Sequence, residues 1–231
     1  MTIIEKYRAF EIGSREKLSQ GQKEALLQAI QRTPEASLTP LSGRMRPHAA
    51  HIEGLGKVIV KHYFRGGLLW HVNRRAYLKT GDTRCRKEFE MLARVREAGI
   101  NAPQPIAFAS LTRHIIFYHA WLLTREIPAA RTLAEISRSA PEQAIAMMPA
   151  LTGQIGALIR NGILHVDLHP GNVLADEDGQ VYLIDFDKAH ISRKSRTWIT
   201  GFYLERWHRA VVKHGLPGFL TEMIKDGQKT G

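Results

Sequence analysis

The 231-residue chain has a single cysteine, Cys85, and no long apolar run. One cysteine excludes a disulfide within the chain. Charged residues occupy the N-terminus where a signal peptide needs an apolar core, so nothing favours secretion. The longest mostly apolar windows, such as "AIAMMPALTGQIGALI", are too short and too polar to span a membrane. We therefore expect a cytoplasmic protein, with peripheral attachment to a membrane surface left open.

Acidic residues are also in short supply, with 22 Asp and Glu against 33 Lys and Arg, which leaves a net charge of +11. This balance favours an anionic partner such as nucleic acid, a phosphorylated substrate or acidic lipid. No basic stretch matches a recognisable nucleic-acid-binding motif, so a nucleic-acid partner is not expected. The 11 histidines are scattered and stand beside one cysteine, which argues against a zinc site.

The first half of the chain, up to residue 127, has mostly β patterning. A short N-terminal strand and an amphipathic helix over 16–32 are expected first. A second helix over 83–98 should end at Gly99. "NAPQPIAFAS" predicts a proline-rich bend. The expected strands of an antiparallel sheet are "LSGRMRPHAAHI", "GKVIVKHYF", "HIIFYHA" and "AWLLTREI".

The second half, 128–231, is rich in helical patterns. "PEQAIAMMPALTGQIGALIRNG" has apolar residues at helical spacing, which predict one wide buried face made of Ile145, Met148, Leu151, Ile155, Leu158 and Ile159. "RTLAEISRS", "TWITGFYLERWHRAVVKHG" and "LPGFLTEMIKDG" also read as helices. We expect an α+β protein with a β-rich N-lobe, 1–127, and a small α-rich C-lobe, 128–231, on either side of a cleft.

A polar hairpin in the second half concentrates oxygen-bearing side chains. In "HVDLHPGNVLADEDGQVYLIDFDKAH", two apolar strands flank the turn "DEDG". Asn172 precedes the first strand and Asp185 follows the second, so antiparallel pairing brings both to the open end, with Asp167 just upstream. Two such oxygen ligands suit Mg²⁺ that also binds phosphate. Asp167 is then left to orient or deprotonate an attacking hydroxyl.

The nucleotide phosphates need a cation, and Lys61 at the end of "GKVIVK" is the candidate. A helix carboxylate would hold this lysine in place. Glu88 lies one turn before the apolar pair Met91 and Leu92 and is the first choice, with Glu90 as the fallback. Taken singly, these residues fit turns, caps or a solvated surface. Their joint spacing favours a site.

The order Lys61, Glu88, "HVDLHPGN" and "DFD" resembles the protein-kinase-like fold, whose pattern is a strand lysine, a helix glutamate, H-x-D-x-x-x-x-N and D-F-G. The resemblance implies that Lys61 contacts the α- and β-phosphates of ATP. It also implies that Asn172 and Asp185 hold Mg²⁺, and that adenine bonds to backbone near Glu126 and Ile127. His165 and His169 are expected to support the loop.

Within that superfamily, the stretch from "VKHYFRGGLLW" to "REAGI" and "VYLIDFDKAH" are similar to the lipopolysaccharide core kinases, first the Kdo kinases and second the heptose kinases. Kdo is the acidic eight-carbon sugar of the inner core. The resemblance implies transfer of the ATP γ-phosphoryl group to a Kdo hydroxyl on lipid A, at the cytoplasmic face of the inner membrane. A basic face for this substrate is expected from Arg65, Arg74, Arg75, Arg84 and Arg86, or from Arg193, Lys194 and Arg196.

Several kinase features are missing from the chain. "LSGRMRPH" lacks the glycines of the nucleotide loop, and Asp187 stands where D-F-G has glycine. There is no A-P-E triplet, and only 46 of the 231 residues follow Asp185, so a peptide substrate is not expected. The alternatives are another small-molecule kinase, since "HVDLHPGN" also resembles aminoglycoside and choline phosphotransferases, or a nucleotide-binding pseudokinase.

Overall fold

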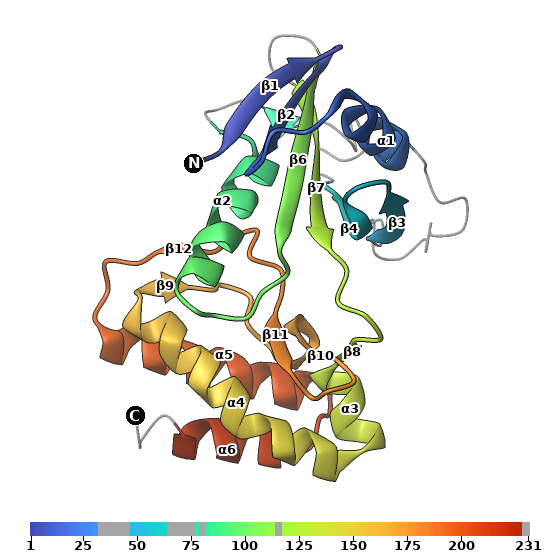
Figure 1. Cartoon of the computed structure of the whole chain (residues 1–231). Helices are drawn as coiled ribbons and strands as arrows, with labels where there is room; N and C mark the ends of the chain where they lie inside the picture. Colours follow the sequence, from blue (N-terminus) through green and yellow to red (C-terminus); the bar gives the residue numbers. More distant parts are fainter. Residues whose placement is uncertain (32–46, 64–76, 79–81, 114–116, 228–231) are drawn as a thin grey trace. The chain divides into compact units, whose positions relative to one another are not determined.

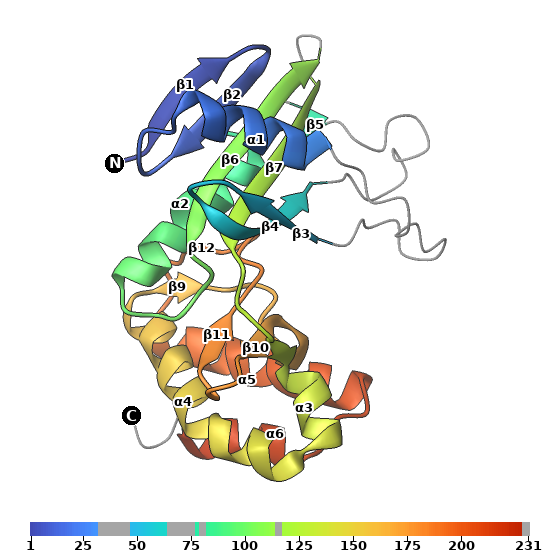
Figure 2. The ribbon, with the colours of Figure 1, turned by 45° about the vertical axis from the view of Figure 1, so that its right-hand side comes forward.

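The computed structural model describes residues 1–31, 47–63, 77–78, 82–113 and 117–227. The chain divides into two compact units (Figures 1 and 2). The first is Met1–Glu90 with Gln104–Glu126, and the second is Met91–Pro103 with Ile127–Gly231. The first unit is built on a large β-sheet and the second mainly on helices. The expected α+β class is confirmed.

An antiparallel sheet forms the first unit, with strand order β1-β2-β6-β7-β4-β3 and β5 beside β7. Its strands are β1 (Ile3–Tyr7), β2 (Phe10–Ser14), β3 (His48–Ile52), β4 (Gly56–His62), β5 (Tyr77–Leu78), β6 (Pro105–Arg113) and β7 (Phe117–Arg125). β4 lies between β3 and β7, so the strand that carries Lys61 is paired on both sides.

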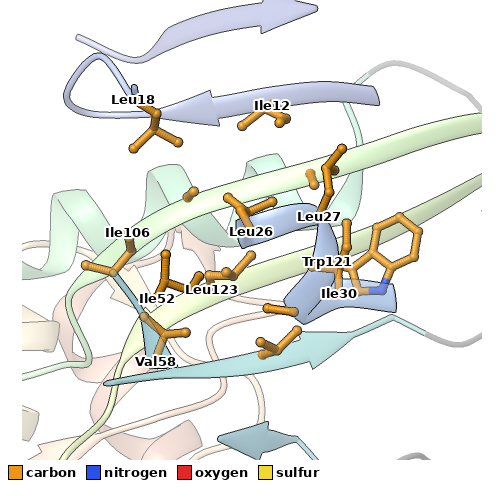
Figure 3. Close-up of a cluster of buried hydrophobic side chains, with 14 of the residues drawn as sticks. Ile12, Leu18, Leu26, Leu27, Ile30, Ile52, Val58, Ile106, Trp121 and Leu123 are labelled. Carbon is orange, nitrogen blue, oxygen red and sulfur yellow. The ribbon is translucent and has the colours of Figure 1, made fainter. Parts of the chain in front are cut away.

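One face of this sheet is covered by α1 (Gln20–Gln31), whose buried leucines meet Val58 and Leu123 in a single apolar core (Figure 3). The helix begins at a capping box, in which Ser19 and Gln22 bond to each other's backbone N–H groups. Because successive strand residues point to opposite faces, burial of Val58 and Val60 toward α1 turns Lys61 to the other face.

The other face of the sheet meets the first half of α2 (Arg84–Glu97). Phe89 packs edge-on against Phe108 at a ring-centroid distance of 5.3 Å. The helix ends as predicted at Gly99, which has φ +75°, and the Ile100 N–H donates to the Val95 carbonyl at 3.1 Å. This Schellman-type end needs a residue that tolerates positive φ. Helix α2 therefore presents Glu88 on the face of the sheet that Lys61 also occupies.

Three expectations for the first unit are corrected. The N-terminus forms a hairpin, β1 and β2, instead of one short strand. "PIAFASLTR" is strand β6 and not part of a bend, and the two strands expected within 114–127 are one continuous strand, β7. Strand β7 is paired on both edges and buried on both faces, so its residues form a nearly unbroken apolar run that hides the period of two.

The second unit packs helices around two small sheets. Its helices are α3 (Leu133–Ser139), α4 (Pro141–Arg160), α5 (Arg196–Lys213) and α6 (Phe219–Gly227), with the short 3₁₀ turn η2 (Pro170–Asn172). The sheets are β11-β10-β8 and β12-β9, built from β8 (Arg131–Thr132), β9 (Ile163–Leu164), β10 (Val173–Ala175), β11 (Val181–Leu183) and β12 (His190–Ile191). Helices α4, α5 and α6 contact one another (Figure 1).

The apolar face predicted for α4 is buried except at one residue. Met148, Leu151, Ile155 and the two following residues of the face are buried, whereas Ile145 is 41% exposed. Position 145 lies in the first turn and a half of the helix, where Ala144, Met147 and Met148 supply the buried side chains instead. Within the described part of the chain, no helix is long and apolar enough to cross a membrane.

Candidate active site

A buried carboxylate holds Lys61 in the first unit. The Lys61 ammonium donates to both oxygens of Glu88, at 3.0 and 2.8 Å. Glu88 is only 3% exposed, while the lysine side chain is 27% exposed. Glu90, the fallback partner, binds Arg86 at 2.9 Å on the outer side of the helix. The structure thus brings Lys61 to Glu88 and not to Glu90.

Tyr63 completes this cluster and was missed by sequence reasoning. Its hydroxyl donates to Glu88, and the Lys61 nitrogen lies 5.2 Å from its ring centroid. Burial, and then the neighbouring carboxylate of Glu88, raise the pKa of Tyr63 well above its usual value. The phenol therefore stays protonated and remains a donor to the carboxylate. The available signal was its position two residues after Lys61, which puts both side chains on one face.

The hairpin in the second unit has the predicted form. Strands β10 and β11 pair with Val173 opposite Leu183, and the Ile184 N–H donates to the Asn172 carbonyl at 3.0 Å. The turn is fixed by Asp176, whose side chain accepts from the Asp178 and Gln180 N–H groups. Asn172 and Asp185 consequently lie at the same open end of the hairpin.

Asn172 is oriented by a bond to the loop that carries Asp167. Its amide Nδ2 donates to the Asp167 carbonyl at 2.8 Å. This bond uses the amide nitrogen, and among the described residues no hydrogen bond to the Oδ1 oxygen accompanies it. An amide oxygen near the Asp185 carboxylate is the donor chemistry that Mg²⁺ favours. The residues present therefore fit a magnesium ion.

Asp185 has an unusual backbone conformation, with φ +65°. Left-handed conformations are uncommon outside glycine, although aspartate tolerates them better than most residues. The next residue, Phe186, is 1% exposed and packs edge-on against His165 at 4.5 Å. Packing of Phe186 thus holds the turn, and the positive φ falls on Asp185 and not on Asp187, the residue that replaces glycine.

His165 is the buried support residue that was expected. The Asp167 N–H donates to His165 Nδ1 at 3.3 Å, which leaves the ring proton on Nε2, 2.9 Å from the Ile184 carbonyl. Burial lowers the pKa of His165, against the opposing effect of the Ile184 carbonyl and the nearby carboxylates. The neutral ring therefore links the loop that carries Asp167 to the strand end that precedes Asp185.

His169 also supports the loop. Its Nδ1 accepts from the Gly171 N–H at 3.1 Å and so caps η2. Partial burial is the main cause that lowers the pKa of His169, so the ring is neutral near pH 7. A neutral ring that accepts at Nδ1 serves the turn, in agreement with the expected structural role.

Helix α5 supplies two further residues that sequence reasoning missed. The Arg206 guanidinium donates to Asp167 Oδ1, and the two side chains are 33% and 37% exposed. The Tyr203 hydroxyl accepts from the His165 N–H and donates to the Ile163 carbonyl, both at 2.8 Å. The two α5 residues are three positions apart, so one face of the helix braces the loop.

The remaining predicted positions are less informative. The Glu126 N–H donates to the Lys57 carbonyl at 3.1 Å, immediately after β7. Binding of adenine to backbone near Glu126 and Ile127 stays a prediction. Most of the nucleotide-loop segment "LSGRMRPH" lies outside the described residues, as do Arg65, Arg74 and Arg75.

The lysine–glutamate pair, the H-x-D-x-x-x-x-N loop and the aspartate after the hairpin together define a protein of the protein-kinase-like class. A solved structure titled "WaaP in complex with acyl carrier protein" has the same fold, with a TM-score of 0.57 and 17% identity over 83% of this chain and 76% of that chain. The expected protein-kinase-like fold is confirmed.

The family model "Lipopolysaccharide kinase (Kdo/WaaP) family" matches residues 40–218, so the chain belongs to that family. Proteins named 3-deoxy-D-manno-octulosonic acid kinase are similar to it. The relative from Photobacterium profundum is 35% identical over 161 residues, 67% of this chain and 64% of that protein. The relative from Vibrio cholerae is 37% identical over 138 residues, 57% of this chain and 56% of that protein. The matches thus cover less than two thirds of these relatives.

Proposed function

We propose that this protein is an ATP- and Mg²⁺-dependent kinase that phosphorylates a sugar hydroxyl of the lipopolysaccharide inner core. The preferred acceptor is Kdo attached to lipid A, since Kdo kinases are similar over more than half of this chain. The observation that carries the proposal is the loop of the second unit. There Arg206 binds Asp167 Oδ1 and the Asn172 amide nitrogen binds the Asp167 carbonyl, which supports contact of Asp167 with a hydroxyl and of the Asn172 amide oxygen with a metal.

Asp167 is proposed to orient the acceptor hydroxyl and accept its proton. Arg206 binds its Oδ1 oxygen, and His169 Nε2 also lies on that side, 4.0 Å away. Among the described residues, Oδ2 has no hydrogen-bond donor, which leaves it for the acceptor. Arg206 is proposed as a positioning residue, because it fixes which carboxylate oxygen meets the hydroxyl.

Lys61 is proposed to bind the α- and β-phosphates of ATP. Glu88 fixes the position of the lysine. Its carboxylate is 3% exposed and accepts hydrogen bonds from Lys61 and from Tyr63, so it has little freedom to move. Asn172 and Asp185 would hold Mg²⁺. When bound, the ion would neutralise charge on the phosphate oxygens.

A place at the cytoplasmic face of the inner membrane follows from the proposed acceptor, because lipid A anchors the sugar in a bilayer. The net charge of +11 is compatible with an acidic sugar and with anionic lipid. Neither a peptide nor a nucleic acid is proposed as a substrate.

The experiment that tests the function is transfer of labelled phosphate from Mg²⁺-ATP to Kdo-lipid A. Heptosylated Kdo-lipid A serves as the parallel acceptor and the Asp167→Asn protein as the control. Label on Kdo-lipid A is the expected result. Label only on the heptosylated acceptor would make the protein a heptose kinase, and ATP binding with no labelled acceptor would favour another small-molecule kinase or a pseudokinase.

A further inference from the structure

The stretch between Asp187 and Glu205 has four Lys and Arg residues and no acid. It comprises β12, the loop that follows and the first half of α5, all in the second unit. Its side chains lie outside the residues proposed for phosphate, metal and hydroxyl, although its cations are one of the two basic faces expected for an acidic substrate. We call it the Trp198 surface and define it by Ile191, Arg193, Lys194, Arg196, Trp198 and Phe202.

The Trp198 surface combines exposed apolar side chains with cations. Trp198 is 45% exposed and Ile191 is 44% exposed, and both lie on the segment that carries the cations. The Lys194 nitrogen lies 5.7 Å from the Trp198 ring centroid, so charge and aromatic surface are adjacent. Arg193 and Arg196 are exposed on the same segment.

Local bonds fix this segment in place. Ser195 caps α5 by accepting from the Trp198 N–H at 3.2 Å, and the Ser192 hydroxyl accepts from the Lys194 N–H at 3.1 Å. Ile191 pairs with Ile163 of β9. The N-terminal end of α5 adds partial positive charge to the side chains around it. The surface is therefore ordered, apolar at two points and positive.

We propose that the Trp198 surface docks the protein onto an anionic lipid bilayer. Tryptophan and isoleucine enter the interfacial region, and the basic side chains bind lipid phosphates. A soluble polyanion would bind the basic side chains but would not contact the exposed indole and isoleucine. This inference rests on the proposed function in one respect: docking is useful because it would hold the enzyme where a lipid-anchored acceptor lies.

The surface is connected to the candidate active site through α5. Trp198 stacks on Phe202 at 5.5 Å, and Phe202 meets the ring of Tyr203 at 6.1 Å. Tyr203 is the residue that bonds to the loop carrying Asp167. From Trp198 to Arg206 the helix rises about 12 Å. Docking at this surface would thus leave about 12 Å of helix between the docked end of α5 and the residue that binds Asp167.

Binding to lipid vesicles tests the proposal. The full chain is sedimented with vesicles of phosphatidylglycerol and phosphatidylcholine, or of phosphatidylcholine alone. We expect binding to the anionic vesicles only. Loss of three charges in Arg193→Gln/Lys194→Gln/Arg196→Gln should weaken it on the order of a hundredfold, and Trp198→Ala on the order of tenfold. The matched control Lys17→Gln/Lys87→Gln/Lys225→Gln removes three exposed lysines elsewhere and should bind like the parent.

Tryptophan fluorescence supplies a second readout at the proposed contact. The signal of Trp198 is obtained by subtracting the spectrum of the Trp198→Phe protein, because the chain has four tryptophans. Brominated anionic lipid should quench this difference signal. Equal binding by the triple variant and its control, or no quenching, would overturn the proposal. A spectral response to soluble polyglutamate but not to vesicles would overturn it in favour of an acidic protein partner.

Kinase assays separate this proposal from the proposed function. With a deacylated, water-soluble Kdo acceptor, the Trp198→Ala variant should keep the parental rate. Its rate should fall only when the acceptor is embedded in anionic vesicles. If the protein binds anionic vesicles as expected but phosphorylates no acceptor, the docking role of the Trp198 surface is supported and the proposed kinase activity is refuted. Normal phosphorylation of the acceptor, together with equal vesicle binding by the parent and the variants, would support the activity and refute the surface.

Discussion

The first unit holds the ion pair between Lys61 and Glu88, and the second holds the pair between Arg206 and Asp167. In the first pair the carboxylate is 3% exposed and the cation 27% exposed, whereas in the second the two side chains are 37% and 33% exposed. A buried carboxylate cannot meet a substrate, so in the first pair only the lysine is accessible to one. In the second pair the carboxylate is accessible, and the arginine supports it.

The difference in burial predicts different consequences of breaking each pair. Removing the cation from the first pair leaves a carboxylate in a nearly dry environment, which costs stability as well as function. In the second pair water can solvate whichever partner remains, so little stability is lost. Activity and stability should therefore separate in the second unit and fall together in the first.

The largest effect is expected at Asp167. The change Asp167→Asn removes the proton acceptor but keeps the shape, so turnover should fall by roughly 10²- to 10⁴-fold. Affinity for ATP should stay nearly the same, because the phosphates are assigned to Lys61. Single-turnover phosphate transfer and equilibrium nucleotide binding measure the two quantities. A turnover close to that of the parent would remove Asp167 from this role.

Arg206 is expected to have the next largest effect on turnover. In Arg206→Met, Asp167 loses its fixed orientation, and kcat should fall by up to about a hundredfold, since misplacement by about 1 Å can cost that much. The KM for ATP should not change. Arg206→Lys should restore part of the rate, because an ammonium can still bind Asp167 Oδ1.

A purely structural role for Arg206 would give a different pattern. Both variants would then lose stability in urea, and kcat and KM would change together. Arg209→Met provides the matched control, since Arg209 lies on the same helix and pairs only loosely with Glu205, at 3.6 Å. It should leave the rate and the unfolding midpoint unchanged.

The first pair should show the opposite asymmetry in stability. Lys61→Met leaves the Glu88 carboxylate with Tyr63 as its remaining donor in the cluster, and should cost about 2 kcal/mol of unfolding free energy, less than for a fully buried pair. Glu88→Gln leaves a lysine that water can reach, and should cost less than about 1 kcal/mol. Urea unfolding of the two variants measures the difference. Equal costs would show that burial does not distinguish the partners.

Sequence reasoning found the first pair and missed the second for a physical reason. Val58 and Val60 mark one face of a strand, so the position of Lys61 follows from the period of two, and Glu88 follows from helical spacing in α2. The hairpin that carries Asn172 and Asp185 also follows from a local signal, since its turn residues predict it.

Arg206 carries no comparable signal. It lies 39 residues after Asp167 on a helix with several other basic residues, and sequence alone does not distinguish it from a solvated charge. The contact depends on how α5 packs on the loop, through the buried Tyr203. Strand β7 was divided wrongly for a related reason, because β4, its partner on one edge, comes from a distant part of the chain, although β6 on the other edge directly precedes it.

Tyr63 offers the smallest and sharpest test of the first pair. Tyr63→Phe keeps the ring beside Lys61 but removes the hydroxyl that donates to Glu88, and should cost about 1 kcal/mol of unfolding free energy. Lys61 still neutralises the carboxylate, so the KM for ATP should rise only slightly. If Lys61→Met/Tyr63→Phe costs more than the sum of the single variants, the two donors compensate for each other at one buried carboxylate. Simple additivity would instead mean that Glu88 depends on Lys61 and Tyr63 independently, and that burial of Glu88 does not couple them.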